Sequence, residues 1–404
     1  MNSSLRNRRI SQSSPITEWS TLGTDILREI TKRLDDATRP EILRLRAVCK
    51  GWRSSIPFPP IPNNVFKRAS LPLEIPFLAL KGFKGKQGHL LLKQDTIYSL
   101  EPLVKIHSGR EVTSNWFVKI EETDDSGKVI LKDPLSRMTI KDLGNTTGLL
   151  KVINLLDYRV RDVGKEYHFE FVLGKNRPVE FTKLKKVVVG KDKSGEYVVV
   201  VLHINGKLAV WKMGEDRWVE IDNGSHYKDI IYHKGRFYAV DRRTWVIAVD
   251  CSSLEITQVA LDACKFGDVY LREYVIYLVK SGDDLYLVNK YGSQFKNTFK
   301  LKEKSGMWVS NFSSWNWLVD RIMFVGSWHC SYSFSAREFP GCKENCIYYR
   351  DDCFISGDRD MDGYPGSAAG VYDFSEYTAR PLKSLSGYSQ LFWPPPHWLK
   401  QTPS

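Results

Sequence analysis

From about residue 70 onward, short runs of β-branched and aromatic residues alternate with turn residues, and this pattern constrains the fold most. The clearest case is the pair Asn205 and Gly206, which separates a Val-rich run from the run Leu-Ala-Val-Trp. Asn-Gly between two apolar runs is the strongest short-range signal for a β-hairpin. Similar pairs of runs surround Gly235 and Gly282. No long amphipathic helix interrupts this rhythm, so we predict a large all-β domain.

A β-propeller fits this rhythm better than the alternative, a pair of β-sandwiches. A four-stranded blade takes roughly 40–50 residues, and about 330 of the 404 residues follow the start of the pattern. The length therefore predicts about six to eight blades, with about seven as the central estimate. Trp211 and Trp218 resemble the pair of aromatic residues in a kelch-type blade. The similar blocks recur at irregular intervals, so a strict repeat is not shown.

The residues before the β pattern divide into three parts. Residues 1–17 are polar and rich in Ser and Arg, which predicts a disordered basic leader. Residues 18–56 have the pattern of a helix, a turn and a second helix. Residues 57–70 begin with a dense run of prolines, which cannot continue a helix and favours an extended linker. We therefore expect a small all-α domain, a linker, and an all-β domain over residues 71–404.

The helical segment has the pattern of an amphipathic helix, with charged residues on the opposite face. The apolar residues that fall on one stripe are Ile26, Leu27, Ile30 and Leu34. We expect Gly51 to interrupt the second helical stretch, because glycine is a poor helix former. About forty residues bury little core alone, so we expect this unit to need a partner surface. Packing against the following domain is the alternative.

Two stretches of this segment closely resemble an F-box. One is Asp-Ile-Leu-Arg-Glu-Ile-Thr-Lys-Arg-Leu at residues 25–34, and the other is Val-Cys-Lys-Gly-Trp-Arg at residues 48–53. The resemblance implies docking on a Skp-type adaptor, which links to a cullin, through apolar side chains at helical spacing. The predicted adaptor-binding residues, some of which we expect to form internal core, are Leu22, Ile26, Leu27, Ile30, Leu43, Val48 and Trp52. Gly23 stands where the family usually has proline, and we expect this difference to weaken the contact.

The C-terminal part carries a second resemblance. Residues 339–352, residues 370–374 and the Pro-Pro-Pro-His-Trp run at residues 394–398 look like those of plant F-box proteins with a KIB-type β-propeller, formerly a domain of unknown function. The order of F-box and then propeller also agrees. The resemblance implies a non-catalytic substrate receptor of an SCF-type cullin ubiquitin ligase, without catalytic residues. Its propeller would bind a target protein for ubiquitination, which the sequence does not identify.

Two other classes of function remain open. One is a propeller enzyme, or a glycan- or ligand-binding protein, with an incidental helical N-terminus. The other is a basic nucleic-acid binder, which the formal net charge of +12 invites. Residues 1–60 hold 11 Lys and Arg against 6 Asp and Glu, so the leader and the helical segment carry much of the excess. We interpret the basic stretch from Lys175 to Lys193 as a solvated strand-and-turn face, and we do not expect a nucleic-acid partner.

Two groups of residues resemble parts of metal sites. Cys342 and Cys346 have zinc-like spacing, but a structural zinc site uses two such pairs. The loop from Asp358 to Asp362 begins like a calcium loop, but Ala369 stands where a bidentate Glu is needed. We therefore predict no metal and no cofactor. An odd number of cysteines, 7, without a secretory signal indicates reduced thiols.

The sequence also bears on location. No apolar run reaches the ~18–20 residues that span a bilayer, so we expect no membrane partner. The leader lacks the apolar region of a secretory signal, although it loosely resembles an organelle transit peptide. We expect the protein in the nucleus, the cytoplasm or both, with organelle targeting by the leader as the alternative.

Overall fold

A computed structural model of the chain has two compact units, Met1–Val65 and Phe66–Ser404. The residues that the structure describes are 22–33, 42, 45–56, 71–77, 88–103, 115–122, 129–140, 157–173, 179–221, 224–260, 275–291, 294–310, 320–327, 330–339, 341–350, 369–385, 391–392 and 395–399. The predicted leader over residues 1–17 and the predicted linker over residues 57–70 lie outside them. Among the described residues, no helix is both long enough and apolar enough to cross a membrane.

The first unit is helical, as its residue pattern predicts. Its helices are α1 (Thr24–Arg33) and α3 (Lys50–Ser55), and residues 45–47 are also helical. The break before α3 falls at Val48 and Cys49, whereas the predicted break at Gly51 is wrong because Gly51 lies inside α3. Cys49 has extended backbone, and its Sγ accepts a hydrogen bond from the Trp52 N–H at 3.4 Å. The thiol thus caps the start of the helix, which otherwise leaves its first N–H groups without partners.

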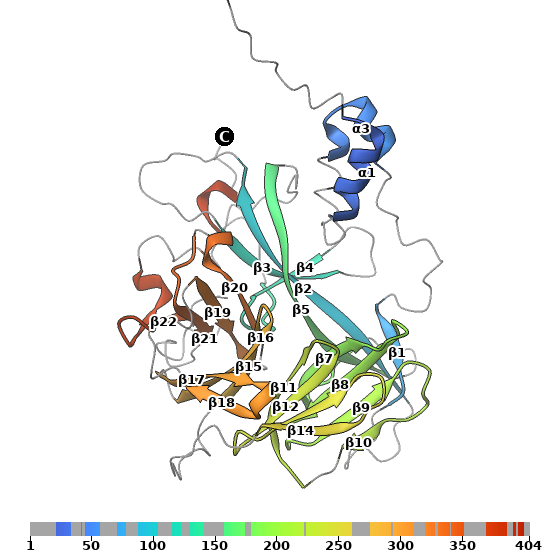
Figure 1. The fold of residues 1–404 in the computed structure, drawn as a ribbon, viewed down its shortest axis with the longest axis vertical. Helices are drawn as coiled ribbons and strands as arrows, with labels where there is room; N and C mark the ends of the chain where they lie inside the picture. The colour runs from blue at the N-terminus through green and yellow to red at the C-terminus, as the bar shows by residue number, and fades with distance from the viewer. Residues whose placement is uncertain are drawn as a thin grey trace, which may run out of the picture. The chain divides into compact units, whose positions relative to one another are not determined.

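The second unit is all β, and much of it consists of four-stranded antiparallel meanders (Figure 1). In each meander, a strand pairs with the next one along the chain. One meander consists of β7 (Leu184–Lys191), β8 (Tyr197–His203), β9 (Leu208–Lys212) and β10 (Val219–Ile221). The next consists of β11 (Tyr227–His233), β12 (Arg236–Asp241), β13 (Val246–Asp250) and β14 (Ile256–Ala260). Another consists of β15 (Val275–Ser281), β16 (Asp284–Tyr291), β17 (Gln294–Lys302) and β18 (Met307–Ser310).

The sheet that begins the second unit, called here the first sheet, is built on two long strands. Its strands are β1 (Leu73–Ile75), β2 (His89–Pro102), β3 (Trp116–Glu122), β4 (Val129–Lys132), β5 (Tyr158–Val172) and β6 (Val179–Glu180). β2 pairs along its whole length with β5 and on its other side with β3. A single residue pair, Tyr167 opposite Val187, joins β5 to β7. The first sheet and the β7–β10 sheet therefore form one continuous ten-stranded sheet.

The last sheet departs from a simple meander. Its strands are β19 (Arg321–Val325), β20 (Ser331–Ser335), β21 (Cys346–Arg350), β22 (Ala369–Asp373) and β23 (Thr378–Pro381). The order is β20-β19-β21-β22-β23, and β19 pairs antiparallel with β20 but parallel with β21. Short 3-10 helices also occur, namely η4 (Glu303–Ser305), η7 (Ala336–Glu338), η10 (Leu382–Ser384) and η11 (His397–Leu399).

The hydrophobic core lies between successive sheets and closes them into a ring. Separate clusters of buried side chains lie between the first and β7–β10 sheets, between β7–β10 and β11–β14, between β11–β14 and β15–β18, and between β15–β18 and the last sheet. A further cluster joins the last sheet back to the first, where the rings of Phe117 and Phe324 lie 5.1 Å apart. A closed ring of packed sheets is a propeller-like architecture, as predicted.

The estimate of about seven blades is not confirmed, because the described residues form five sheet units. The estimate assumed that the whole length is divided among regular blades. β2 and β5 are instead 14 and 15 residues long. The first sheet alone extends from Leu73 to Glu180, which is far more chain than a regular blade of roughly 40–50 residues uses.

The predicted hairpins are confirmed. β8 and β9 pair antiparallel across the Asn-Gly turn, with Leu202 opposite Leu208. Gly206 has a φ of 85°, a value that glycine adopts without strain. Trp211 and Trp218 lie with ring centroids 6.4 Å apart in the core between the first and β7–β10 sheets.

Candidate functional site

The helical unit buries part of the predicted adaptor-binding set and exposes another part. Leu27 and Trp52 are 1% and 6% exposed and form the core of this unit with Ile56. Ile26 and Val48 are instead 53% and 51% exposed. The helical unit therefore presents apolar side chains that its own core does not use.

The other predicted adaptor-binding residues are neither fully buried nor fully exposed, or lie outside the described residues. Leu22 is half-buried and packs against the small core, and Ile30 is also half-buried. Leu43 lies outside the described residues. The Gly23 carbonyl accepts a hydrogen bond from the Leu27 N–H at 3.1 Å, which places Gly23 at the start of α1. A side chain at Gly23 would meet nothing within 4 Å, so its effect on docking stays a prediction.

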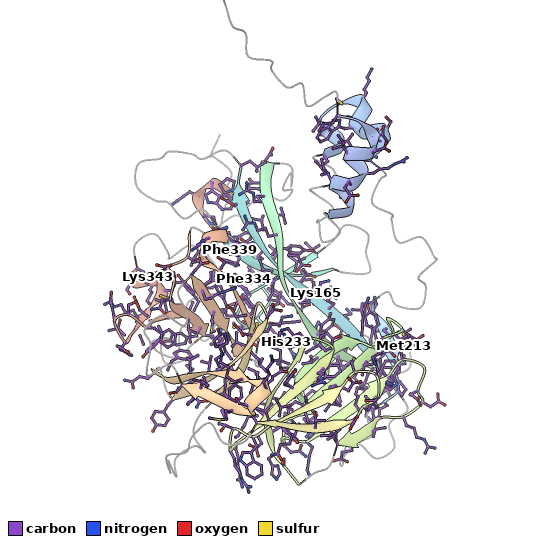
Figure 2. All side chains as sticks on the ribbon, in the orientation of Figure 1. Lys165, Met213, His233, Phe334, Phe339 and Lys343 are labelled. Carbon is purple, nitrogen blue, oxygen red and sulfur yellow. The ribbon has the colours of Figure 1, made fainter. Side chains whose placement is uncertain are left out.

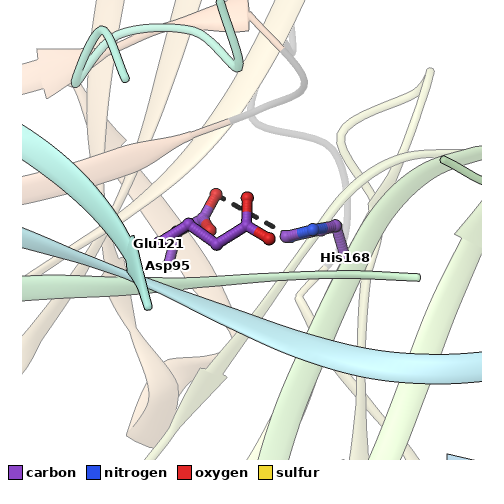
Figure 3. Close-up of side chains that lie close together, drawn as sticks. All are labelled: Asp95, Glu121 and His168. Atoms are coloured by element: carbon purple, nitrogen blue, oxygen red, sulfur yellow. Dashed lines mark ion pairs between the residues drawn. The ribbon is translucent and has the colours of Figure 1, made fainter. Parts of the chain in front are cut away.

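A cluster of charged side chains is buried in the first sheet. Asp95 on β2, Glu121 on β3 and His168 on β5 place atoms of the metal-ligating kind within 4.8 Å of one another (Figure 3). Asp95 and Glu121 are direct cross-strand partners. His168 Nδ1 lies 3.7 Å from Asp95 Oδ2. Such a group invites a test of whether a metal ion fits.

The residues present do not fit a metal ion, because an ammonium group already binds the carboxylates. Lys132 Nζ lies 2.9 Å from Asp95 Oδ2 and 2.6 Å from Glu121 Oε2. Burial lowers the pKa of His168 from its ordinary value of 6.5, so the imidazole adds no positive charge near neutral pH. The cluster is therefore a buried ion-pair network that fastens β2, β3 and β4 together.

The network continues along the first sheet. Lys119 is fully buried, and its Nζ lies 2.7 Å from Glu166 Oε2 and 2.5 Å from the Ser136 carbonyl oxygen. Lys93 lies 3.0 Å from Glu170 and 3.3 Å from Glu121. The sequence does not predict this network, because its members come from four separate strands. The sequence does contain one signal for it. Lys93 and Asp95 are two residues apart, as are Lys119 and Glu121, so each pair lies on one face of its strand.

A cavity of about 460 Å³ lies where strands from the successive sheets approach one another. Its lining comes from β2, β5, β7, β11, β15 and β20, from Cys330 just before β20, and from the turn after β4. We call it the central cavity. Its charged lining residues are Arg137, Asp162, Lys165, Glu166, Lys186 and Lys280. Figure 2 labels Lys165 on β5, and it also labels His233 at the neighbouring smaller cavity that shares Lys280 with the central one.

Asp229 on β11 lies behind one wall of the central cavity and hydrogen-bonds to the strands that form that wall. Its carboxylate is fully buried and accepts hydrogen bonds from Lys186 Nζ at 2.9 Å and from the Leu278 N–H at 2.7 Å. These contacts tie β7, β11 and β15 together. The Lys186 charge is thus held at the cavity by a buried partner.

The basic stretch from Lys175 to Lys193 is not a uniformly solvated face, which corrects the sequence interpretation. Lys186 is half-buried and lines the central cavity, and Lys185 is half-buried beside it in β7. Burial, followed by the charges of nearby lysines, lowers the pKa of Lys185 to about 8. These lysines are half-buried because β7 lies between β5 and β8 and lines the central cavity.

The other sequence candidates contribute no site in the described part of the chain. Cys342 and Cys346 are buried, and burial raises the pKa of the Cys346 thiol to about 12, which keeps it protonated. The calcium-like loop, Asp358 to Asp362, lies outside the described residues.

Two models of known protein families match the chain. The model described as KIB1-4 beta-propeller matches residues 90–373. The model described as F-box domain matches residues 19–62. The first match covers most of the ring of sheets, and the second covers the helical unit.

Similar proteins are F-box proteins of Arabidopsis thaliana. F-box protein SKIP23 is 28% identical, with 95% of this chain and 96% of the relative covered. F-box protein At2g17036 is 25% identical, with 95% of each chain covered. F-box/kelch-repeat protein At1g64840 is 24% identical over 91% of this chain and 90% of the relative.

Proposed function

Because the chain belongs to the plant F-box proteins with a KIB1-4 β-propeller, we propose that it is a substrate-receptor subunit of an SCF-type cullin ubiquitin ligase. The F-box docks on a Skp-type adaptor and through it on a cullin, and the propeller binds the target protein. The chain itself supplies no catalytic group to the transfer of ubiquitin to the target. It acts in the nucleus, the cytoplasm or both.

The exposure of apolar side chains on the helical unit carries this proposal. Ile26 and Val48 are about half exposed, although their neighbours Leu27 and Cys49 pack into the unit. Apolar anchors on a helical surface are what a partner groove recognises. We therefore assign direct adaptor contact to Ile26 and Val48, and we assign support of that surface to Leu27 and Trp52.

A receptor of this kind promotes ubiquitination by proximity. Holding a target on the same assembly as a conjugating enzyme raises the effective concentration of target lysines near the reactive thioester. This role needs two separate binding surfaces on one chain, one for the adaptor and one for the target. The division of the chain into two compact units supports this role.

Substitution of the exposed residues tests the adaptor contact. The double variant Ile26→Asp with Val48→Asp should reduce co-purification of a Skp-type adaptor at least about tenfold, because it places two carboxylates in an apolar groove. Size-exclusion chromatography with quantified adaptor gives the measurement. The melting temperature should change little, because both side chains are exposed.

Ile256→Asp is the matched control. Ile256 is 45% exposed on β14, outside the F-box, and its substitution should leave adaptor recovery unchanged. Leu27→Asp is unsuitable because it would place a charge in the core of the helical unit. Equal adaptor recovery with the wild-type chain and the double variant would contradict the proposed docking surface.

A further inference from the structure

The central cavity is lined by strands from all five sheet units of the ring. It lies at the inner strands of the ring, since β5, β7, β11, β15 and β20 each contribute to its wall. Loops and inner strands of several sheets can thus contact one ligand at the same time. Cavities formed between structural elements in this way are common ligand sites.

The charges of this lining do not balance. Four basic side chains and two acidic ones line the central cavity. Behind the wall, Glu166 pairs with the fully buried Lys119 at 2.7 Å, and Lys186 pairs with the fully buried Asp229 at 2.9 Å. These two buried partners have opposite charge, so they leave the balance of the lining unchanged. Lys165 lies 3.9 Å from Asp162, which is a loose contact between partly exposed groups. The wall therefore presents an excess of positive charge to whatever enters.

Lys280 is the clearest source of this excess. It lies on β15, its side chain reaches solvent, and it lines both the central cavity and its smaller neighbour. Among the described residues, its ammonium group has no ion-pair or hydrogen-bond partner. Burial and the nearby Lys186 ammonium lower the pKa of Lys280, so the surroundings disfavour its charge. An anion placed between Lys280 and Lys186 would relieve this repulsion.

We propose that the central cavity binds an anionic group, a phosphate or a carboxylate, on a side chain of the target protein, with Lys280 and Lys186 as its main charged contacts. This inference rests on the proposed function, in which the propeller binds the target. Lys165 and Arg137 add positive charge at the same wall. Charge-assisted hydrogen bonds to such a group are about twice as strong as neutral ones.

The size and the apolar part of the wall fit this class of ligand. A volume of about 460 Å³ holds a side chain with its neighbouring residues but not a folded domain or a nucleic-acid duplex. Val187, Ile231 and Tyr232 also line the cavity and offer apolar contact beside the basic groups. A peptide segment that carries one anionic group matches this mixed lining better than an inorganic ion.

Binding to full-length protein tests the inference. The probe is a fluorescein-labelled pool of random-sequence peptides with one central phosphoserine, compared by anisotropy with the same pool carrying serine. The wild-type chain should bind the phosphoserine pool at least about tenfold more tightly. Lys280→Met should weaken that binding by about 10- to 100-fold, the loss expected for one charge-assisted hydrogen bond. Lys165→Met should weaken it less, because Lys165 already has Asp162 within 3.9 Å.

Lys304→Met is the matched control, because Lys304 is an exposed lysine in η4, outside both cavities. It should bind the phosphoserine pool as the wild-type chain does. Equal affinity for the two pools, or an equal effect of Lys280→Met and Lys304→Met, would overturn the inference. Binding of inorganic pyrophosphate that depends on Lys280, without preference between the pools, would overturn the assignment to a target side chain.

The outcome can be separated from that of the proposed ligase role. Capture of a Skp-type adaptor is measured on the same proteins and should be unaffected by Lys280→Met. Adaptor capture without preference for the phosphoserine pool would remove only the cavity assignment. Preference for that pool without adaptor capture would remove the ligase role and leave the cavity assignment standing.

Discussion

The buried lysines of the first sheet show how single residues decide its stability. Lys132 is 7% exposed and faces Asp95 and Glu121, which are themselves buried. Burying one carboxylate is costly, and burying two beside each other requires a cation. Lys132 supplies that cation, so it is a structural residue although lysine is usually found on surfaces.

Lys132→Met should lower the free energy of unfolding by about 3–5 kcal/mol, because it leaves two buried carboxylates facing each other. Chemical denaturation at pH 7 measures the change. Lys234→Met is the control, because Lys234 pairs with Asp283 at 3.2 Å on the surface, with side chains 53% and 92% exposed. Its loss should cost about 0–1 kcal/mol. Equal losses in the two variants would show that the network contributes no more than a surface pair.

The ion pair between Lys132 and Glu121 also predicts that the stability of the fold depends on pH. Burial works to raise the pKa of Glu121, but the hydrogen bond and charge of Lys132 outweigh it and hold the pKa below its ordinary value of 4.5. A carboxylate with a depressed pKa stabilises the fold fully above pH 4.5 and loses that contribution as the pH falls below it. The stability difference between the wild-type chain and Lys132→Met should therefore narrow as the pH falls from 5 toward the pKa of folded Glu121. A constant difference over that range would contradict this assignment.

The sequence could predict the residue types of the helical surface but not which of them face outward. Ile26 and Leu27 are adjacent, and both fit the apolar stripe of one helix. Leu27 is buried because α3 places Trp52 against it, whereas Ile26 lies at the edge of the stripe. That distinction depends on how two helices pack, and the helical period of one does not contain it.

At the scale of elements, the inner strands determine how closely neighbouring sheets approach. Gly190 on β7 is buried, and a Cβ there would lie 2.5 Å from Cε2 of Tyr232 and 2.8 Å from Cζ of Phe237. Tyr232 is held by a hydrogen bond from its hydroxyl to the Lys191 carbonyl oxygen at 3.1 Å. The absence of a side chain at Gly190 therefore lets β7 approach the aromatic side chains of β11 and β12.

Gly190→Ala should destabilise the protein by about 1–3 kcal/mol, because overpacking forces the aromatic rings out of place. Thermal unfolding measures the effect. The control is Gly164→Ala on β5, where a Cβ would meet nothing nearer than Ile97 Cδ1 at 3.8 Å. That change should be within about 0.5 kcal/mol of neutral. A neutral Gly190→Ala would mean that β7 and β11 separate without cost.

At the scale of the whole β domain, the sequence predicts the class of fold better than its dimensions. The hairpin signals are local, so Asn205 and Gly206 were sufficient to locate β8 and β9. The number of sheets depends on how much chain each one uses, and nothing local marks the unusual length of β2 and β5. The central cavity depends on which strands become the inner ones, so Lys280 and Lys186 could not be associated from their positions in the sequence.

The C-terminal segment contributes to the closure of the ring of sheets. The family match ends at residue 373, yet Leu391, Phe392 and Leu399 are at most 1% exposed. The Leu391 carbonyl oxygen accepts the Phe117 N–H at 2.8 Å, and that of Phe392 accepts the Trp116 indole N–H at 2.9 Å. The C-terminal segment therefore covers the junction of the last sheet with the first.

A chain truncated after Leu385 should lose at least about 5 kcal/mol of stability, since each large buried side chain contributes about 2–5 kcal/mol. A chain that ends at Lys400 is the control, because it keeps Leu391, Phe392 and Leu399. Thermal unfolding compares the two, and near-ultraviolet circular dichroism reports the packing of Trp116. A shorter chain as stable as the control would show that the ring closes without this segment. The measurement thus decides whether the functional propeller includes residues beyond the family match.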